Sequence, residues 1–244
     1  MKSSKIAIIL FVFIVFSLSF CFLFLANSSW LRIDGYELEG VSSYSIKSNM
    51  IKHIGSNYLF LNKGKLEKDI KSLGYVDSVS FKFRDNTLVC NIKARENGII
   101  AYSDAIAFFF DGTDVSVMDH RDAYSLRENY LIVEVGKEYS IYMQKYGFDS
   151  DLIDVLRILY NTDVARTLIT RAQFNDNKSN VTKSLTLDLE ELSSALIISD
   201  LSKLSALPDC LDYISRENES KLYDTIFSKS VYQLKSNGLV RIKR

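Results

Sequence analysis

The chain has 244 residues, enough for two modest domains or for one domain with a tether. Its 30 basic and 30 acidic side chains balance, so the charge indicates neither a nucleic-acid partner nor an acidic tail. One proline and ten glycines argue against low-complexity linkers. Beyond its N-terminus, the composition predicts a globular protein.

The N-terminus carries the sharpest signal, because residues 6–26 include no charged side chain. A helix of about 20 residues spans the hydrocarbon core of a bilayer. Lys2 and Lys5 precede this run and acidic residues follow it, so the positive-inside rule places residues 1–5 in the cytoplasm. Trp30 lies where an interfacial aromatic residue would anchor the helix. We therefore expect a transmembrane helix at 6–26 and an extracytoplasmic remainder.

Two other interpretations of the N-terminus stay open. A cleaved signal peptide has an apolar run of about 7–15 residues, shorter than this one, yet the segment 26–29 would serve as a weak cleavage site. A lipoprotein would use Cys21, but the preceding Phe20 is too bulky for a typical lipobox. A retained anchor is the favoured prediction.

The cysteines offer little chemistry. Cys90 and Cys210 would face an oxidising compartment and could pair if they lay close together. However, Cys90 is in phase with Leu88 and Ile92 on the apolar face of its predicted strand. A buried free thiol is therefore favoured at Cys90, and no cysteine spacing suggests zinc.

The segment after the apolar run has the order strand, helix, helix, strand, strand. Apolar residues alternate in the strands and recur at helical spacing in the helices. The last two strands flank a polar turn in which aspartate and asparagine tolerate the required dihedral angles. Two amphipathic helices can cover one face of a three-stranded sheet. The elements are expected near 31–38, 46–54, 65–73, 76–83 and 88–92.

This segment resembles the FtsQ/DivIB family of bacterial cell-division proteins. The first strand ends at Leu38-Glu39-Gly40, and the family's asparagine-to-leucine spacing between the helices is present at 57–61. The family usually has prolines at the hairpin turn and after the Arg-Glu pair, where this chain has Asp85 and Asn97. The clearest match is the hairpin, carried by Tyr75, Val76, Val79, Thr87, Leu88, Ile92, Arg95 and Glu96.

The resemblance implies an α+β fold and a function without catalysis. The chain would be a divisome scaffold of the cytoplasmic (inner) membrane, located at the division septum, with FtsB/FtsL-like single-pass proteins as partners. It would need no cofactor and no small-molecule substrate. Its parts would be a cytoplasmic tail at 1–5, a transmembrane helix at 6–26, a POTRA domain of β-α-α-β-β order at 30–97, and a mixed β-sheet domain with helices at 98–244.

Residues 98–244 are richer in strands. Asp111-Gly112 is a strong turn signal between apolar stretches. Leu152, Val155, Leu156 and Leu159 form one helical stripe. We expect two strands within 99–118, a buried strand at 130–135, a helix around 152–159, strands at 165–174 and 184–191, a strand followed by a helix from about 200, and a final strand at 231–242.

Catalytic chemistry has few candidates. His120 stands between Asp119 and Asp122 and could bind a cation or act as a base, although a solvated polar loop is favoured. Asp188, Glu190 and Glu191 suggest a charged sheet face more than an acid–base set. Phosphate-binding, nucleophile and metal motifs are absent from the sequence. We therefore predict no enzyme and name no catalytic, cofactor-binding or metal residues.

Without an active site, function must lie on surfaces, and sheet edges are templates for an added strand. The strand at 78–83, with Val79 and Phe81, is expected at one edge, and the final strand at another. The resemblance implies that the last strands bind the partner. Completion of the chain's own sheet is an equally good account of any one residue there. The implied partner-binding residues are Tyr232, Leu234, Gly238, Leu239 and Val240.

Two rival functions stay open. An exported POTRA-like chaperone or component of a secretion or assembly complex would be favoured if the N-terminus were cleaved. An envelope hydrolase would depend on His120.

Overall fold

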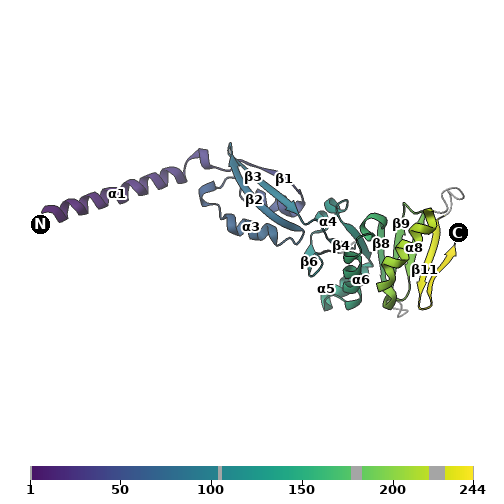
Figure 1. Ribbon diagram of the computed structural model, residues 1–244. Coiled ribbons are helices and arrows are strands. Elements are labelled where there is room, and N and C mark those ends of the chain that lie inside the picture. The colour runs from purple at the N-terminus through teal and green to yellow at the C-terminus, as the bar shows by residue number, and fades with distance from the viewer. Residues whose placement is uncertain (1, 104–105, 177–182, 220–228, 244) are drawn as a thin grey trace. The chain divides into compact units, whose positions relative to one another are not determined.

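The computed structural model describes residues 2–103, 106–176, 183–219 and 229–243. The chain divides into two units, one formed by residues 1–72 and 76–94 and the other by 73–75 and 95–244 (Figure 1). Each unit contains helices and a sheet with parallel and antiparallel pairs, which confirms the α+β class.

The first element of the chain is the helix α1 (Lys2–Ala26), followed by the short 3-10 helix η1 (Ser29–Leu31). The helix expected at 6–26 is therefore present. In the part of the chain that the structure describes, no helix has both the length and the apolar character needed to cross a membrane. The assignment of this helix as a transmembrane span is thus unsupported.

The first unit has a three-stranded sheet in the order β1-β3-β2. The central strand β3 pairs in parallel with β1 and antiparallel with β2, so β1 and β2 are the outer strands. The order strand, helix, helix, strand, strand agrees with the prediction from the sequence. The elements are β1 (Gly35–Gly40), α2 (Tyr44–Ile51), η2 (Tyr58–Phe60), α3 (Lys63–Lys71), β2 (Val76–Arg84) and β3 (Thr87–Ala94).

Local side chains explain where these elements begin and turn. The Ser43 hydroxyl accepts a hydrogen bond from the Ile46 amide at the start of α2. The Asn62 side chain accepts one from the Lys65 amide at the start of α3. Asp85 and Asn86 have φ values of 50° and 60°, as a two-residue type I′ hairpin requires.

The core of the first unit lies between the helices and the sheet. The apolar stripe of β3 predicted from the sequence is buried, and Cys90 is a buried free thiol, as expected. Burial raises the pKa of Cys90 to about 12. The buried side chains of the helices and of β3 are Ile46, Met50, Leu66, Ile70, Leu88, Val89, Cys90 and Ile92.

The second unit has a nine-stranded sheet in the order β12-β11-β10-β9-β8-β7-β4-β5-β6. The pairs β4–β7, β7–β8 and β10–β11 are parallel, and the other neighbours are antiparallel. Its strands are β4 (Ile99–Tyr102), β5 (Ala107–Phe110), β6 (Val115–Met118), β7 (Leu131–Val135), β8 (Arg171–Asp176), β9 (Lys183–Leu189), β10 (Ser194–Ile198), β11 (Ser230–Lys235) and β12 (Gly238–Lys243).

Helices α5, α6 and α8 supply buried side chains to one apolar core with the sheet, and Figure 1 shows them over its strands. The stripe predicted around 152–159 lies in α6 and is buried, as expected. The helices are α4 (His120–Leu126), α5 (Lys137–Tyr146), α6 (Ser150–Asn161), α7 (Ala165–Leu168), the 3-10 helix η3 (Leu201–Ala206) and α8 (Leu207–Glu219).

Several predictions for the second unit were wrong in detail. The segment 99–118 forms three strands, because the apolar run divides into β4 and β5 before the expected turn at Asp111-Gly112. The segment 165–174 begins as α7 and becomes a strand only at Arg171. Helix α5 was not predicted. The strand at 184–191 and the helical region after 200 agree with β9, η3 and α8.

Candidate functional site

The C-terminal strand predicted at 231–242 is in fact a hairpin of two strands, β11 and β12. The chain turns at residues 236–237, and Gly238 has a φ of +118°, a conformation that other residues rarely adopt. The Asn237-Gly238 dipeptide is a strong turn signal that would have located this hairpin. Only β12 is an outer strand, since β11 pairs with β10 on its other side.

The hairpin buries two of the predicted partner-binding residues. Tyr232 and Leu234 point from β11 into the core of the second unit. Their side chains thus cannot form pockets at the surface. Leu239 on β12 is half-buried against the same core, whereas Gly238 begins the outer strand.

Among the predicted partner-binding residues on β12, Val240 is the most exposed to solvent. Side chains alternate along a strand, so Val240 and Ile242 point away from the face that holds Leu239. Val240 is 40% exposed and Ile242 is 50% exposed. The second face of β12 is therefore an apolar surface at the edge of the nine-stranded sheet.

A polar cluster beneath β12 fixes this edge to the rest of the unit. The Glu217 carboxylate on α8 accepts a hydrogen bond from the Tyr232 hydroxyl at 2.8 Å and one from Arg241 Nη1 at 2.9 Å. Arg241 Nη2 donates to the Ser230 hydroxyl at 2.6 Å. Burial, together with the Glu217 carboxylate, raises the pKa of Tyr232 to about 12.

Sequence reasoning missed Glu217 and Arg241. Arg241 is in phase with the inward-facing Leu239, and an arginine at a core-facing position requires a charged or polar partner. That spacing would have indicated an ion pair on the core side of the strand. It did not identify Glu217, which lies on a different element.

The other predicted edge is in the first unit. Val79 and Phe81 belong to β2, which is an outer strand of the three-stranded sheet, as expected. Val79 is buried and Phe81 is half-buried, so both side chains contribute to packing within the unit.

The segment around His120 differs from the solvated loop that was predicted. It forms the start of α4, where the Asp119 carboxylate accepts a hydrogen bond from the Arg121 amide. His120 Nε2 lies 3.0 Å from the Ser103 carbonyl oxygen. Asp122 is fully buried and accepts a hydrogen bond from the Tyr75 hydroxyl at 2.9 Å. These three side chains therefore hydrogen-bond to three different groups, the Arg121 amide, the Ser103 carbonyl oxygen and the Tyr75 hydroxyl.

Asp122→Ala is expected to reduce the free energy of unfolding of the second unit by about 2 kcal/mol, because the buried Tyr75 hydroxyl loses this acceptor. Asp122→Asn keeps an acceptor oxygen and should cost less. Urea denaturation of both variants, with Tyr75→Phe and the double variant, gives the coupling energy. Additive single effects would show that the hydrogen bond contributes nothing.

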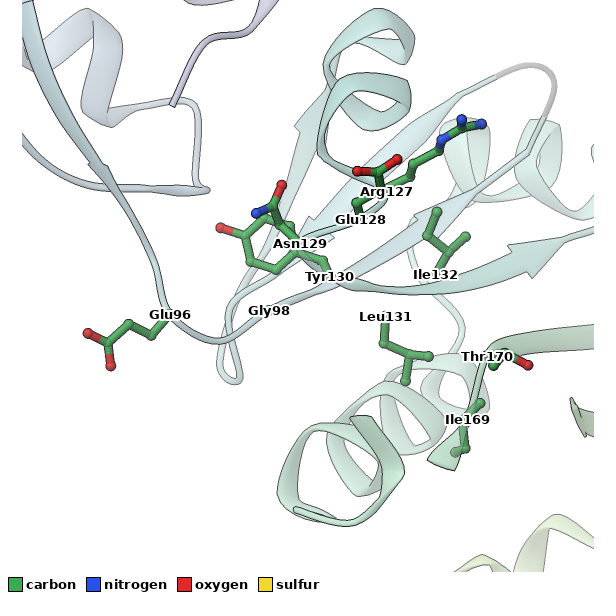
Figure 2. A pocket seen from close by; sticks show the side chains of 10 residues that line it. All are labelled: Glu96, Gly98, Arg127, Glu128, Asn129, Tyr130, Leu131, Ile132, Ile169 and Thr170. Atoms are coloured by element: carbon green, nitrogen blue, oxygen red, sulfur yellow. The ribbon is translucent and has the colours of Figure 1, made fainter. Parts of the chain in front are cut away.

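A pocket of about 270 Å³ lies beside β4 and β7 (Figure 2). Glu96 lies well away from Arg127 and Glu128 in this view, so the charged side chains do not meet at one point. The Tyr130 hydroxyl donates a hydrogen bond to the Arg95 carbonyl oxygen at 2.8 Å. The lining residues are Glu96, Gly98, Arg127, Glu128, Asn129, Tyr130, Leu131, Ile132, Ile169 and Thr170.

Among the described residues, no group of three or more histidine, cysteine, aspartate or glutamate side chains is placed to hold a metal ion. No known protein-family model matches the chain, and comparison with curated proteins finds no match. The resemblance to the FtsQ/DivIB family therefore stays a prediction. The β12 edge is the candidate site that the geometry favours.

Proposed function

We propose that this chain is a non-enzymatic scaffold of the bacterial divisome, attached to the inner membrane at the septum. Its extracytoplasmic units, a POTRA domain at 30–97 and an FtsQ-like β domain at 98–244, recruit other single-pass division proteins of the FtsB/FtsL kind. No cofactor or small-molecule substrate takes part. The β12 edge is the observation that carries this proposal.

Outer strands normally carry protection against unwanted pairing, most often charged side chains or proline. On β12 the charge of Arg241 is directed to Glu217, and the side chains on the second face are Val240 and Ile242. An outer strand with an apolar exposed face favours strand addition, in which a partner's backbone pairs with the edge while its side chains contact that face.

Membrane attachment rests on α1. From Leu10 to Leu25 its large apolar side chains are exposed on all sides of the helix. A helix that is apolar all round needs an apolar environment, which in a chain of this size is a bilayer or another apolar helix. Confinement to the membrane plane would raise the effective concentration of partners and strengthen modest contacts.

Val240→Asp is expected to weaken capture of the partner at least about tenfold, because strand addition would bury the new charge at the interface. The measurement is site-specific photo-crosslinking in dividing cells, with the crosslinking residue at position 242. Val117→Asp is the matched control, since Val117 is 70% exposed on β6, the other outer strand of the same sheet. Equal crosslinking in both variants would contradict a site at β12.

The runner-up function is an exported POTRA-like chaperone or a component of a secretion complex, which would use the same strand edges elsewhere in the envelope. An N-terminal fluorescent fusion separates the two. A band at mid-cell supports the divisome scaffold, and uniform envelope signal from an intact fusion favours the runner-up. A freed fluorescent fragment would show that the N-terminus is a cleaved signal peptide.

A further inference from the structure

Two asparagines bond to the end of α1 and to the short helix η1 that follows it. Asn57 Nδ2 donates to the carbonyl oxygens of Leu25 and Ala26 at 2.9 and 3.0 Å, where a helix has carbonyls without intrahelical partners. Asn86 Nδ2, in the β2–β3 turn, donates to the Ser29 carbonyl oxygen at 2.8 Å. Two separate loops are therefore bonded to this stretch of chain, one to the end of α1 and the other to η1.

One of these loops, residues 54–60, is itself fixed. The Gly55 amide donates to the Ile33 carbonyl oxygen at 2.7 Å, and the Ile33 amide donates to the Ser56 carbonyl oxygen at 2.9 Å. The Ile33 side chain is buried, and the Tyr58 ring stacks on Phe83 of β2 at 4.6 Å between centroids. The loop thus presents a defined surface beside α1.

That surface is apolar and exposed. Trp30 is 76% exposed, Leu59 54% and Phe60 51%. The Phe60 ring contacts Phe22 of α1 edge-to-face, with 5.3 Å between centroids. The apolar surface of α1 therefore continues onto the folded unit. We call Trp30, Leu59 and Phe60 the helix-end surface.

Lysines flank the 54–60 loop in the sequence, because Lys52 caps the end of α2 before it and Lys63 and Lys65 lie in the first turn of α3 after it. A hollow of about 230 Å³ between α2 and α3 is lined by Lys52 and Lys65, and also by His53 and the acidic Asp69. Lys63 lies over the ring of Tyr58, 4.1 Å from its centroid. Exposed aromatic and apolar side chains flanked by lysines are typical of surfaces that contact anionic headgroups.

We propose that the helix-end surface lies against the bilayer, with Trp30, Leu59 and Phe60 at headgroup depth and Lys52, Lys63 and Lys65 beside anionic lipid phosphates. This rests on the proposed membrane attachment through α1. The bilayer is the expected binding partner of this surface, because the surface is continuous with α1. Phe60 contacts Phe22 of that helix, so a bilayer that surrounds α1 also reaches Phe60. The first unit then contacts the membrane directly through this surface, in addition to its covalent connection to α1.

The single tryptophan of the chain makes this testable. The full-length protein is reconstituted into phosphatidylcholine–phosphatidylglycerol vesicles containing lipids brominated near the headgroup, which quench nearby tryptophan. Two Trp30→Phe proteins are compared, one with Leu59→Trp as the probe and one with Tyr44→Trp as the matched control. Tyr44 is a suitable control because it is exposed and lies at the other end of β1 from α1. It begins α2, which follows the Gly40 end of β1. Asn86 and Ser29, by contrast, lie beyond the Gly35 end of that strand.

The tryptophan at position 59 is expected to be quenched by the brominated lipid and to shift to shorter wavelength, and the one at position 44 to change little. Adding Lys52→Glu, Lys63→Glu and Lys65→Glu should reduce the quenching and its sensitivity to salt, whereas Lys47→Glu, on the exposed surface of α2, should not. Circular dichroism checks that every variant is folded.

Co-flotation with vesicles separates the outcomes. If the protein floats with the vesicles and position 59 is not quenched, the seating on the bilayer is overturned while attachment through α1 stands. If the protein does not float, attachment through α1 fails and the seating fails with it. The emission at position 59 could also shift to shorter wavelength only when another protein is added, without quenching by lipid. That result would identify a protein-docking surface and would overturn the proposal.

Discussion

Replacing Gly40 by alanine is expected to destabilise the first unit by about 3 kcal/mol. Gly40 ends β1 with a φ of +90°, and a Cβ there would lie 2.1 Å from the carbonyl oxygen of Ile92, its partner on β3. The clash involves backbone, so neither strand can yield without losing the β1–β3 pairing. The new side chain is therefore strained both by its own dihedral angle and by its neighbour.

Labelling of the buried thiols measures this effect unit by unit. Cys90 lies in β3 of the first unit and Cys210 in α8 of the second. If labelling requires opening, a loss of about 3 kcal/mol should accelerate the modification of Cys90 about a hundredfold and leave Cys210 unchanged. Gly35→Ala is the control, because a Cβ at Gly35 meets no atom within 4 Å. Equal Cys90 rates in the two variants would refute the backbone argument.

Glu217→Ala should lower the free energy of local unfolding at the candidate site by about 3 kcal/mol, because a partly buried ion pair loses one member and the Tyr232 hydroxyl loses its acceptor. Hydrogen exchange of residues 230–243, followed by mass spectrometry, is expected to accelerate. Since the cluster lies on the core side of β12, the variant should also weaken partner capture without altering the exposed Val240.

Two variants test whether the effect of Glu217 comes from its position. Glu217→Gln keeps an acceptor for Tyr232 and should fall between the native protein and the alanine variant. Asp212→Ala removes an exposed ion pair with Arg216 on the same helix and should change stability by less than about 0.5 kcal/mol. Similar exchange rates in Asp212→Ala and Glu217→Ala would show that the cluster has no special role.

The parts of the fold that were predicted correctly have local causes. The β2–β3 hairpin follows from alternation on both sides of Asp85-Asn86, a pair of residues that tolerates positive φ. Helix α6 follows from a stripe of three leucines and one valine at helical spacing. In each case, neighbouring residues alone determine the element.

The errors have physical reasons too. Strands β4 and β5 are buried along nearly their whole length, so neither shows the alternation that marks a half-buried strand. Helix α5 is rich in tyrosine, which favours strands, and among its residues with described burial Tyr139 and Met143 mark the buried side. Its helical form depends on packing against the core.

The candidate site could be predicted only in outline. An outer strand near the C-terminus was expected, but its register and its partner strand depend on a parallel pairing between β10 and β11 that no local pattern encodes. The same is true of Glu217 and Arg241, which meet across 24 positions of sequence. Burial of Tyr232 and Leu234 follows from these long-range pairings.

The buried thiol of Cys90 has a consequence for redox chemistry. Thiol–disulfide exchange proceeds through the thiolate, and a thiol with a pKa of about 12 is ionised in only about one molecule in 100,000 at neutral pH. In the extracytoplasmic location proposed here, folding itself would therefore protect this cysteine from oxidants. Oxidation would instead affect chains whose first unit has not yet folded, because Cys90 is exposed in them. The rate of folding would therefore determine what fraction of the chains forms incorrect disulfides.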